Sequence, residues 1–337
     1  MTKKKANIYD VAALAGVSHQ TVSRVLNDHP SIKPATRERV EEAIKSLAYR
    51  PNPAARQLVT AKSRIIGLLV GDTGLYGPAG MLNAMETQAR AAGYFAFSVA
   101  VQADSRESWL NGIEHLGALH IEGMVTIALP RAIFADVKQR LKGIALMSID
   151  TEGASDKLTV QVDNFEGGRL ATQHLIGLGH KNIVHITGLS SSNEANERER
   201  GYLTAIESAG LKPNVVVGDW SSDTGYSIAS SLDFDSNEVT AVFCANDHLA
   251  LGVLKALSKR GITVPDRVSV MGFDDVPESA YFQPGLTTVK QDFKALGAMA
   301  MEHLLAQLNN VPDRADQVLT PVLVVRESVA PPPKNLK

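Results

Sequence analysis

The spacing of hydrophobic and polar positions divides the chain into two unlike parts, which meet near residue 64. Before this point, apolar residues recur at helical spacing in three short segments. After it, short apolar runs alternate with longer amphipathic segments. The first pattern predicts a small helical unit, and the second predicts an α/β unit with parallel strands.

Residues 7–26 predict two short helices joined at Gly16, where a tight turn is possible. Asn7 can cap the first helix, and Val11 and Leu14 are expected to form its apolar face. This arrangement is typical of a helix-turn-helix. An ordinary helical hairpin with a solvated polar face would give the same pattern, so both interpretations stay open on these residues alone.

The second of these helices separates apolar from polar side chains. Ser18 can cap its first turn. The positions expected to point inward are Val22, Val25 and Leu26. The polar side chains that remain partly outward are His19, Gln20, Thr21, Ser23 and Arg24. Such side chains can hydrogen-bond to base edges and phosphates, so DNA binding is the first hypothesis.

A third helix is expected to begin at Pro34, whose fixed φ suits a first helical turn, and to complete a head of residues 1–50. Pro51 and Pro53 end that helix. Residues 51–63 then predict a short hinge helix. Isolated helices shorter than about 12 to 15 residues are marginal in water, so we expect the hinge to order only with a partner.

The rest of the chain predicts an α/β body over residues 64–330, followed by an extended tail at 331–337. Eight apolar runs predict parallel strands, and eight strands suit two sheets better than one. The segments expected to be helical between them include 79–92, 165–178, 194–209 and 247–259. The predicted fold class is therefore a doubly wound α/β body that carries a three-helix head.

Charge divides the chain in the same way. The 337 residues carry a net charge of −2, but residues 1–64 hold twelve Lys or Arg against five Asp or Glu, so they carry +7 and the remainder −9. A basic module on an acidic body suits nucleic-acid binding, because neutralising phosphates supplies sequence-independent affinity. The alternative is a solubilising tail, against which the periodic apolar residues of this segment argue.

The single cysteine, Cys244, excludes an intramolecular disulfide and a cysteine-based zinc site, and it is expected in a buried strand. We expect no metal and no cofactor. The basic start lacks a following apolar region, and no stretch approaches eighteen apolar residues. A soluble, cytoplasmic protein without a membrane partner is therefore expected.

Several ordered phrases together resemble the lactose/galactose repressor family of bacterial transcription regulators. They are the head sequence, NPAARQL in the linker, LGHKNIVHITG, ANDHLALG and GFDD, and they cover nearly the whole chain. The resemblance implies a body like a periplasmic binding protein, with two subdomains and three chain crossings. The implied subdomains are about 64–163 plus 293–320, and about 164–290 plus 321–330.

The resemblance also implies how the head binds DNA, since in this family the second helix enters the major groove. The matching base readers are His19, Gln20 and Arg24. Gln can pair with adenine and Arg with guanine. One member of the family carries tyrosine at the His19 position, which puts an operator identical to that member's in doubt. Phosphate contacts are expected from Ser18, Thr21 and Ser23. For Ser18, helix capping is an equally good interpretation.

In the hinge, the resemblance makes Leu58 the side chain that wedges into the minor groove at the centre of a palindromic site, one from each subunit. Asn52, Ala55 and Arg56 would line the same hinge helix. The alternative for Leu58 is packing against its own body domain.

An effector cleft is expected between the subdomains, at the carboxyl ends of the strands. The polar groups placed there are Asp150, Arg198, Asn246 and Asp274, with Trp220 to stack on a sugar ring. By the resemblance, an aromatic wall and an apolar rim are added by Phe293, Leu75, Gly77, Pro78 and Met81. This set favours a galactoside or similar neutral sugar over a purine. Taken singly, Trp220 could be core, and Asp274 could cap a helix.

The expected function is that of a homodimeric repressor which leaves a palindromic operator when a sugar binds, through allosteric coupling. A ligand-strengthened regulator is the alternative within the family. Outside it, Asp150 and Asp274 could form the carboxylate pair of a carbohydrate enzyme, or the body could serve a transport receptor. The basic head argues against both. The chain ends without a leucine heptad helix, which favours a dimer over a tetramer.

Overall fold

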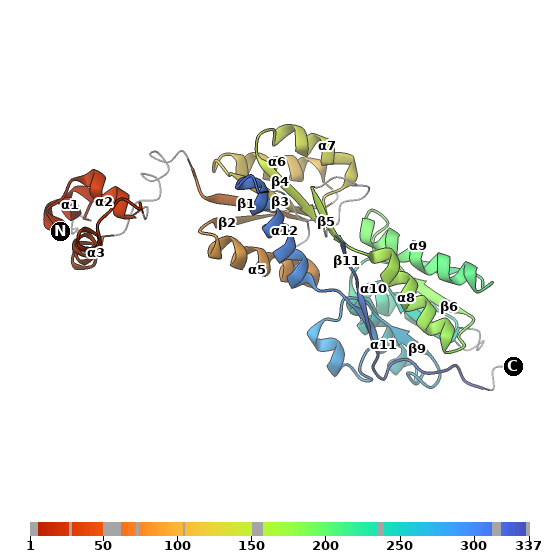
Figure 1. Cartoon of the computed structure of the whole chain (residues 1–337). Coiled ribbons are helices and arrows are strands. Elements are labelled where there is room, and N and C mark those ends of the chain that lie inside the picture. Colours follow the sequence, from red (N-terminus) through yellow and green to blue (C-terminus); the bar gives the residue numbers. More distant parts are fainter. Residues whose placement is uncertain are drawn as a thin grey trace. The chain divides into compact units, whose positions relative to one another are not determined.

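The chain forms two compact units, residues 1–64 and residues 65–337 (Figure 1). In this computed structural model, the residues that are described are 6–26, 29–49, 62–71, 74–103, 105–149, 158–234, 239–311 and 318–334.

The described part of the N-terminal unit contains three helices: α1 (Ile8–Ala15), α2 (His19–Leu26) and α3 (Pro34–Ser46). Their buried core is made by Val11, Ala12, Ala15, Val22, Val25, Val40 and Ala43. The expectation for Leu14 was wrong, since 57% of its surface is exposed. The inward face of α1 is centred between Val11 and Ala15, and Leu14 lies to one side of it because each residue turns the helix by about 100°.

The ends of these helices are fixed by the expected capping groups. The Asn7 side chain accepts the backbone N–H of Tyr9 at 2.8 Å, and the Asp10 carboxylate accepts the N–H of Asn7 at 2.8 Å, which completes a capping box. Gly16 ends α1 with φ 62°, a left-handed conformation that suits glycine. Pro34 occupies the first turn of α3, as predicted.

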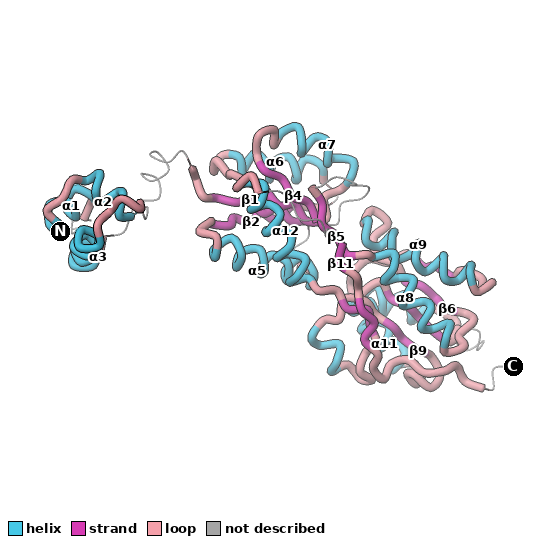
Figure 2. The backbone as a smooth tube through the Cα atoms, viewed as in Figure 1, coloured by secondary structure: helices cyan, strands magenta, loops and turns pink. Residues whose placement is uncertain are grey.

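The first lobe of the C-terminal unit is built on a six-stranded sheet, whose strands are magenta in Figure 2. The strand order is β11-β5-β4-β3-β1-β2, and every neighbouring pair is parallel. Its strands are β1 (Ile65–Gly71), β2 (Phe95–Val101), β3 (Gly123–Ile127), β4 (Ala145–Ile149), β5 (Thr159–Val162) and β11 (Val318–Leu319). One face packs against α5 (Tyr76–Ala91) and α12 (Phe293–Leu308), and the other against α6 (Arg106–Gly117) and α7 (Arg131–Arg140) (Figure 1).

The second lobe is a four-stranded parallel sheet in the order β7-β6-β8-β9. Its strands are β6 (Ile183–Ile186), β7 (Asn214–Val216), β8 (Ala241–Cys244) and β9 (Ser269–Met271). One face packs against α8 (Asn164–Gly177) and α9 (Asn193–Ser208), and the other against α10 (Ser222–Ser231) and α11 (Asp247–Lys259). A short 3-10 helix, η1 (Pro277–Tyr281), and an antiparallel pair, β10 (Thr288–Lys290) with β12 (Val322–Val324), complete the lobe.

The chain crosses between the lobes three times: from β5 into α8, from β10 into α12, and from β11 into β12. The predicted α/β class and the two sheets are confirmed. The strands of two to four residues at the crossings were not predicted, because they are too short to show a period of alternation. Of the boundaries that differ from the expectation, two lie at the site described below. Helix α5 begins at Tyr76, and β7 ends at Val216, so Trp220 lies in the loop that follows.

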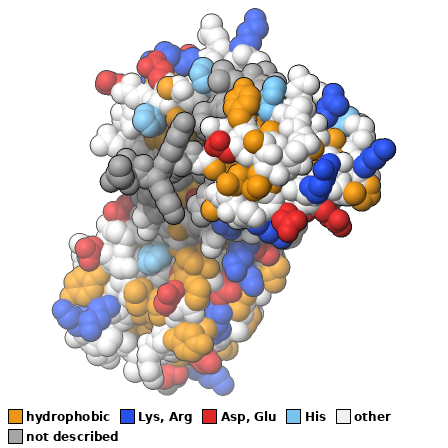
Figure 3. Space-filling model, turned by 90° about the vertical axis from the view of Figure 1, so that its left-hand side faces the viewer, with side chains coloured by type: hydrophobic (Ala, Val, Ile, Leu, Met, Phe, Trp, Pro, Cys, Tyr) orange, Lys and Arg blue, Asp and Glu red, His pale blue; other side chains and the backbone are white. Residues whose placement is uncertain are grey.

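Hydrophobic side chains reach the surface of the C-terminal unit. Phe95, on the edge strand β2, is 62% exposed, and Tyr281, in η1, is 87% exposed. On the face drawn in Figure 3, hydrophobic groups lie among basic and acidic ones. Exposed apolar groups on an edge strand are typical of an interaction surface. Within the described ranges, no helix has the length and apolar character needed to span a membrane.

Candidate functional site

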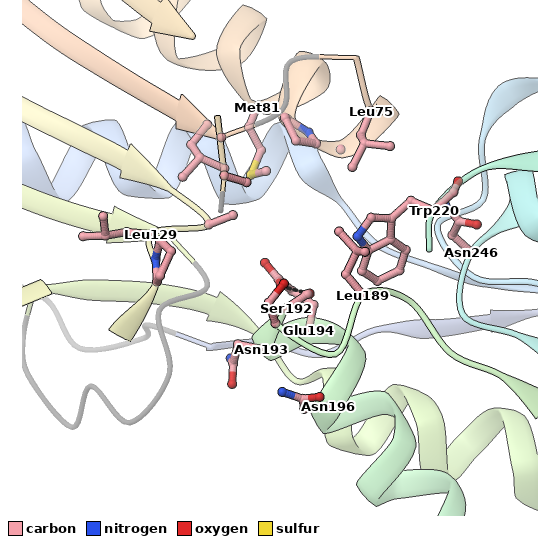
Figure 4. Close-up of a pocket in the computed structure, with 18 of the residues that line it drawn as sticks. Leu75, Met81, Leu129, Leu189, Ser192, Asn193, Glu194, Asn196, Trp220 and Asn246 are labelled. Carbon is pink, nitrogen blue, oxygen red and sulfur yellow. Dashed lines mark hydrogen bonds between the residues drawn. The ribbon is translucent and has the colours of Figure 1, made fainter. Parts of the chain in front are cut away.

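A cavity of about 620 Å³ lies between the two lobes of the C-terminal unit. Its walls come from the loops that follow β1, β2 and β3 in the first lobe and β6 to β9 in the second, and from the crossing before α12. The predicted effector residues among the described positions all line it: Leu75, Gly77, Pro78, Met81, Arg198, Trp220, Asn246, Asp274 and Phe293. Four of them, Leu75, Met81, Trp220 and Asn246, are labelled in Figure 4. Asp150, the remaining predicted residue, lies outside the described residues.

Arg198 is held by hydrogen bonds in the wall formed by the second lobe. It lies in the second turn of α9, and 4% of its surface is exposed. Its Nε donates to Asn164 Oδ1 at 2.8 Å, and its Nη1 donates to the Ala245 carbonyl. The same Nη1 lies 3.7 Å from Asp274 Oδ1, which makes a buried ion pair. These contacts fix the guanidinium in one orientation at the cavity.

Aromatic rings cover the Arg198 guanidinium. Its Cζ lies 3.9 Å from the centre of the Phe273 ring and 5.4 Å from that of the Trp220 ring. Both distances fall in the range of cation–π contacts. The Trp220 indole lies against Gly188, where a Cβ would stand 2.4 Å from the ring. Glycine at 188 therefore makes room for the indole in the second lobe.

Two glycines allow α9 to approach α8 closely enough for Arg198 to reach Asn164. A Cβ at Gly201 would lie 2.1 Å from the Phe165 carbonyl oxygen, and one at Gly168 would lie 2.2 Å from the Arg198 carbonyl oxygen. Both obstacles are backbone atoms, which cannot rotate away. The geometry of the Arg198 cluster therefore depends on glycine at these helical positions.

The Asp274 carboxyl lies beside Arg198, and burial raises its pKa to about 6 although Arg198 and the Gln291 amide favour the charged form. The Gln291 Nε2 donates to Asp274 Oδ1 at 2.7 Å. The helix-capping alternative for Asp274 receives no support, because its backbone is left-handed with φ 108° and its side chain serves Gln291 and Arg198. Asp274 thus offers the cavity an acceptor whose charge depends on pH near neutrality.

Asp247, the next carboxylate behind the cavity, is fully buried. It accepts the Val276 N–H at 2.9 Å and the Thr288 hydroxyl at 2.6 Å. Burial, and secondarily the negative charge of Asp274, raise its pKa to about 8. In the unfolded chain the carboxyl would titrate near 3.8. Folding therefore holds a proton on Asp247 across the neutral range.

The raised pKa of Asp247 predicts that the effect of Asp247→Asn on the free energy of unfolding depends on pH. The folded protein keeps a proton that the unfolded chain releases above pH 3.8, so the contribution of Asp247 to the free energy of unfolding is complete below that pH and is lost as pH rises toward 8. An asparagine cannot ionise. Between pH 5 and pH 8, the free energy of unfolding of the variant should therefore rise relative to that of wild type by about 2 kcal/mol or more, since one pKa unit corresponds to about 1.4 kcal/mol.

Thermal unfolding followed by circular dichroism at pH 5, 6, 7 and 8 checks this result. The matched control is Asp266→Asn, at an exposed position, for which the difference from wild type should stay constant. A constant difference for Asp247→Asn as well would show that this carboxyl is charged in the folded protein.

Asn246 connects the cavity wall to the helix behind it. It is the N-cap of α11, where its Oδ1 accepts the Leu249 N–H at 2.8 Å, and its Nδ2 donates to the Trp220 carbonyl at 3.1 Å. This capping role was not predicted. It fixes the loop that carries Trp220 against the start of α11.

On the wall of the first lobe, Gly77 makes room for Phe293. A Cβ at residue 77 would lie 2.7 Å from the Phe293 ring, which packs over the first turn of α5. Tyr76 meets the same ring edge-on, with 5.8 Å between the ring centres. The apolar rim is therefore continuous from α5 to the first residue of α12.

Sequence reasoning missed a group of polar lining residues at the start of α9: Ser191, Ser192, Asn193, Glu194 and Asn196 (Figure 4). Ser192 also caps α9, where its Oγ accepts the Ala195 N–H at 3.3 Å. The signal for them was present, since this polar run directly follows a buried strand that ends at the cavity. Leu129, Leu189, His248 and Gln291 were missed as well.

In the N-terminal unit, α2 presents the predicted DNA-contacting side chains. Ser18, His19, Gln20 and Arg24 are exposed, and Thr21 and Ser23 are half-buried. The Ser18 Oγ accepts the Thr21 N–H at 3.2 Å, so it makes the expected cap. The His19 ring lies 5.1 Å from the Tyr9 ring, centre to centre. The predicted hinge contacts Asn52, Ala55, Arg56 and Leu58 lie outside the described residues.

Both units match known protein families. Residues 7–52 match the family described as bacterial regulatory proteins, lacI family, and residues 172–329 match the periplasmic binding protein-like domain. The lactose operon repressor of Escherichia coli K12 is 30% identical over 331 residues, which are 98% of this chain and 92% of that protein. The chain belongs to the lacI family of bacterial regulatory proteins.

Other relatives agree with this assignment. The transcriptional repressor PurR of Pasteurella multocida is 34% identical to this lacI-family protein, over 96% of this chain and 98% of its own. A crystal structure of the lac repressor dimer, bound to operator and an anti-inducer, superposes with a TM-score of 0.90 at 31% identity, covering 97% and 100% of the two chains. The lacI-family protein is a DNA-binding transcriptional repressor, and the enzyme alternative is excluded.

Proposed function

We propose that the protein is a homodimeric repressor that binds a palindromic operator through its head and releases it when a neutral, galactoside-like sugar fills the cavity. In this proposal residues 1–50 are the head, 51–63 the hinge and 64–330 the body. The observation that carries the proposal is the convergence of Arg198 and Asp274 with the Trp220 ring at one cavity.

The chemistry of this wall suits a sugar. A pyranose presents hydroxyls that both donate and accept, and an apolar face of C–H groups. The guanidinium of Arg198 donates and the Asp274 carboxylate accepts, while the half-buried Trp220 offers a flat apolar surface. The pH-sensitive Asp274 favours a neutral ligand over an anionic one, because an anion beside this carboxylate would meet like charge.

The DNA side of the proposal rests on α2 and on the family. The exposed His19, Gln20 and Arg24 suit base edges in a major groove, and Ser18, Thr21 and Ser23 suit phosphates. The hinge contacts at Asn52, Ala55, Arg56 and Leu58 stay predictions from the resemblance. A regulator of this kind acts at the chromosome, which favours the cytoplasm.

Two observations support a dimer. The similar crystal structure described above is that of a lac repressor dimer bound to operator. This chain also exposes apolar side chains such as Phe95 on the edge strand β2. Two heads related by a two-fold axis match a palindromic site. Because the cavity is lined by both lobes, the binding energy of a ligand in it can favour one arrangement of the lobes over another. A coupling of roughly 1 to 3 kcal/mol would change operator affinity by about 5- to 150-fold.

A thermal-shift screen of the full-length protein against neutral sugars tests the effector class. A sugar present at 100 times its dissociation constant should stabilise the body by about 2.7 kcal/mol. The control is Trp220→Leu, which removes the stacking surface and should weaken the shift. Equal shifts in wild type and variant, or no shift with any neutral sugar, would contradict the proposed effector site.

A further inference from the structure

Asp275 directly follows the proposed sugar-binding carboxylate Asp274 and has no role in the function proposed above. The two residues form part of the loop between β9 and η1, and both have a positive backbone φ, 108° for Asp274 and 56° for Asp275. Residues other than glycine rarely adopt this conformation, which costs energy and persists only where surrounding contacts hold it. The orientation of Asp274 therefore depends on the contacts that hold this turn.

Arg326 holds the side chain of Asp275. It lies two residues beyond β12, and its Nη2 donates to Asp275 Oδ1 at 2.6 Å in a largely buried ion pair. Its Nη1 donates to the Leu286 carbonyl at 2.8 Å, and its backbone N–H donates to the Thr287 hydroxyl at 2.9 Å. Because the guanidinium is planar and presents its donors in a fixed fork, these bonds restrict where the Asp275 carboxylate can lie.

The backbone on either side of Asp275 is held by other groups. The Asp274 N–H donates to the Val289 carbonyl in β10 at 2.8 Å. The Val276 N–H donates to the buried Asp247 carboxylate at 2.9 Å. The strained turn is therefore fixed by its flanking backbone and, through one side chain, by an ion pair to a distant segment of the chain.

Removal of Arg326 would leave the largely buried Asp275 carboxylate without its cation. An unpaired buried charge favours movement toward water, and a strained backbone favours relaxation, so the turn would shift and carry Asp274 with it. We propose that Arg326 is a positioning residue for the effector site: through Asp275, it holds the Asp274 carboxylate where it faces Arg198 and the sugar. The inference rests on the proposed sugar-binding function and extends it to a residue outside the described lining of the cavity.

A double-mutant cycle, measured by calorimetric titration of the full-length protein with methyl β-galactoside, tests whether Arg326 acts through Asp275. Arg326→Met and Asp275→Ala should each weaken binding at least about tenfold, because each removes a hydrogen bond between charged groups. The double variant should be no more than about threefold weaker than either single variant, since both changes release the same turn. Asp275→Asn keeps the oxygen that accepts from Arg326 and should retain most of the affinity.

Arg260→Met is the matched control for a general loss of stability. Arg260 follows α11 in the same lobe, and its Nη1 donates to the Ala229 and Leu232 carbonyls at 3.2 and 2.6 Å. The control should bind the sugar within about threefold of wild type. The inference is overturned if Arg326→Met binds as tightly as wild type, if the two losses multiply to about a hundredfold in the double variant, or if Arg260→Met loses as much affinity.

Hydrogen exchange examines the turn without a ligand. The hydrogen-bonded amides of Asp274 and Val276 should exchange at least about tenfold faster in Arg326→Met than in wild type, but not in Arg260→Met. Unchanged exchange in Arg326→Met would overturn the inference whatever the sugar does. If the wild type binds no neutral sugar, the proposed function fails, and exchange still shows whether Arg326 holds the turn. Should Arg326→Met not fold, Asp275→Ala takes its place in both measurements, because Arg326 then keeps its other hydrogen bonds.

Discussion

Arg198→Met is expected to abolish effector binding and to lower the free energy of unfolding by about 3 to 5 kcal/mol, because it leaves a buried carboxylate without its cation. The guanidinium is hydrogen-bonded to Asn164 and to the Ala245 carbonyl and paired with Asp274. Methionine fills a similar volume but replaces none of these donors. Unfolding in urea, together with a sugar titration of the folded variant, measures both effects.

Arg200→Met is the matched control. Arg200 lies two residues further along α9, is largely exposed, and pairs with Glu197 within the same helix. Exposed pairs of this kind contribute at most about 1 kcal/mol, so the control should retain the sugar response and nearly all of its stability. If both variants lost the same amount of stability and of sugar binding, the buried ion pair of Arg198 and Asp274 would not be what stabilises the cavity wall of the second lobe.

The loss of stability caused by Arg198→Met should also depend on pH. Without the guanidinium, the pKa of Asp274 rises further above 6, so the carboxyl takes up a proton more readily. Protonation removes the unpaired charge, and the destabilisation should be smaller at pH 5 than at pH 8. If the loss of stability does not depend on pH, it arises from the lost packing of Arg198 against Phe273 and Trp220 and not from the unpaired charge of Asp274.

Gly201→Ala should destabilise the protein by about 3 kcal/mol, the upper part of the range for overpacked sites. In an unhindered helix the same change stabilises by up to about 1 kcal/mol, so the sign itself is informative. The new Cβ would lie 2.1 Å from the Phe165 carbonyl oxygen and 2.6 Å from the Arg169 nitrogen, both in the backbone of α8. Helix α9 must then move and carry Arg198 with it, so effector affinity should fall as well.

Gly177→Ala supplies the control within the neighbouring helix. Gly177 is the last residue of α8, and a Cβ there would meet no atom within 4 Å. This variant should be as stable as wild type or more stable. If Gly201→Ala proves as stable as Gly177→Ala by urea unfolding, the close approach of α8 and α9 is not needed for the site.

The elements of the fold that could be predicted are those with enough residues to show a period. The strand Ile65–Gly71 and the helix Asp247–Lys259 are examples, and both lie where the pattern predicts them. The crossing strands β10 and β12 have three residues each and are defined by pairing between distant segments, which periodicity does not reveal. Leu14 was misplaced because two apolar residues, Val11 and Leu14, do not determine which side of a short helix faces the core.

At the site, strand ends and the resemblance predicted nine of the described side chains that line the cavity, but not how these side chains are held. Asn246 was predicted as a ligand-binding amide, and the structure adds that it caps α11 and supports the Trp220 loop. Gly77 was expected at the apolar rim. The structure shows why this position needs glycine: the Phe293 ring occupies the space that a Cβ would fill. Such features arise from packing between segments far apart in the chain, so no local pattern reports them.

In the proposed mechanism, occupancy of the cavity controls how tightly the head binds DNA. The most direct test is fluorescence anisotropy of a labelled operator, selected from random-sequence duplexes with the full-length protein, with and without a saturating sugar whose binding calorimetry has established. The sugar should weaken operator binding by about 5- to 150-fold. An operator affinity that stays unchanged, or that rises, while the sugar demonstrably occupies the protein would contradict this mechanism.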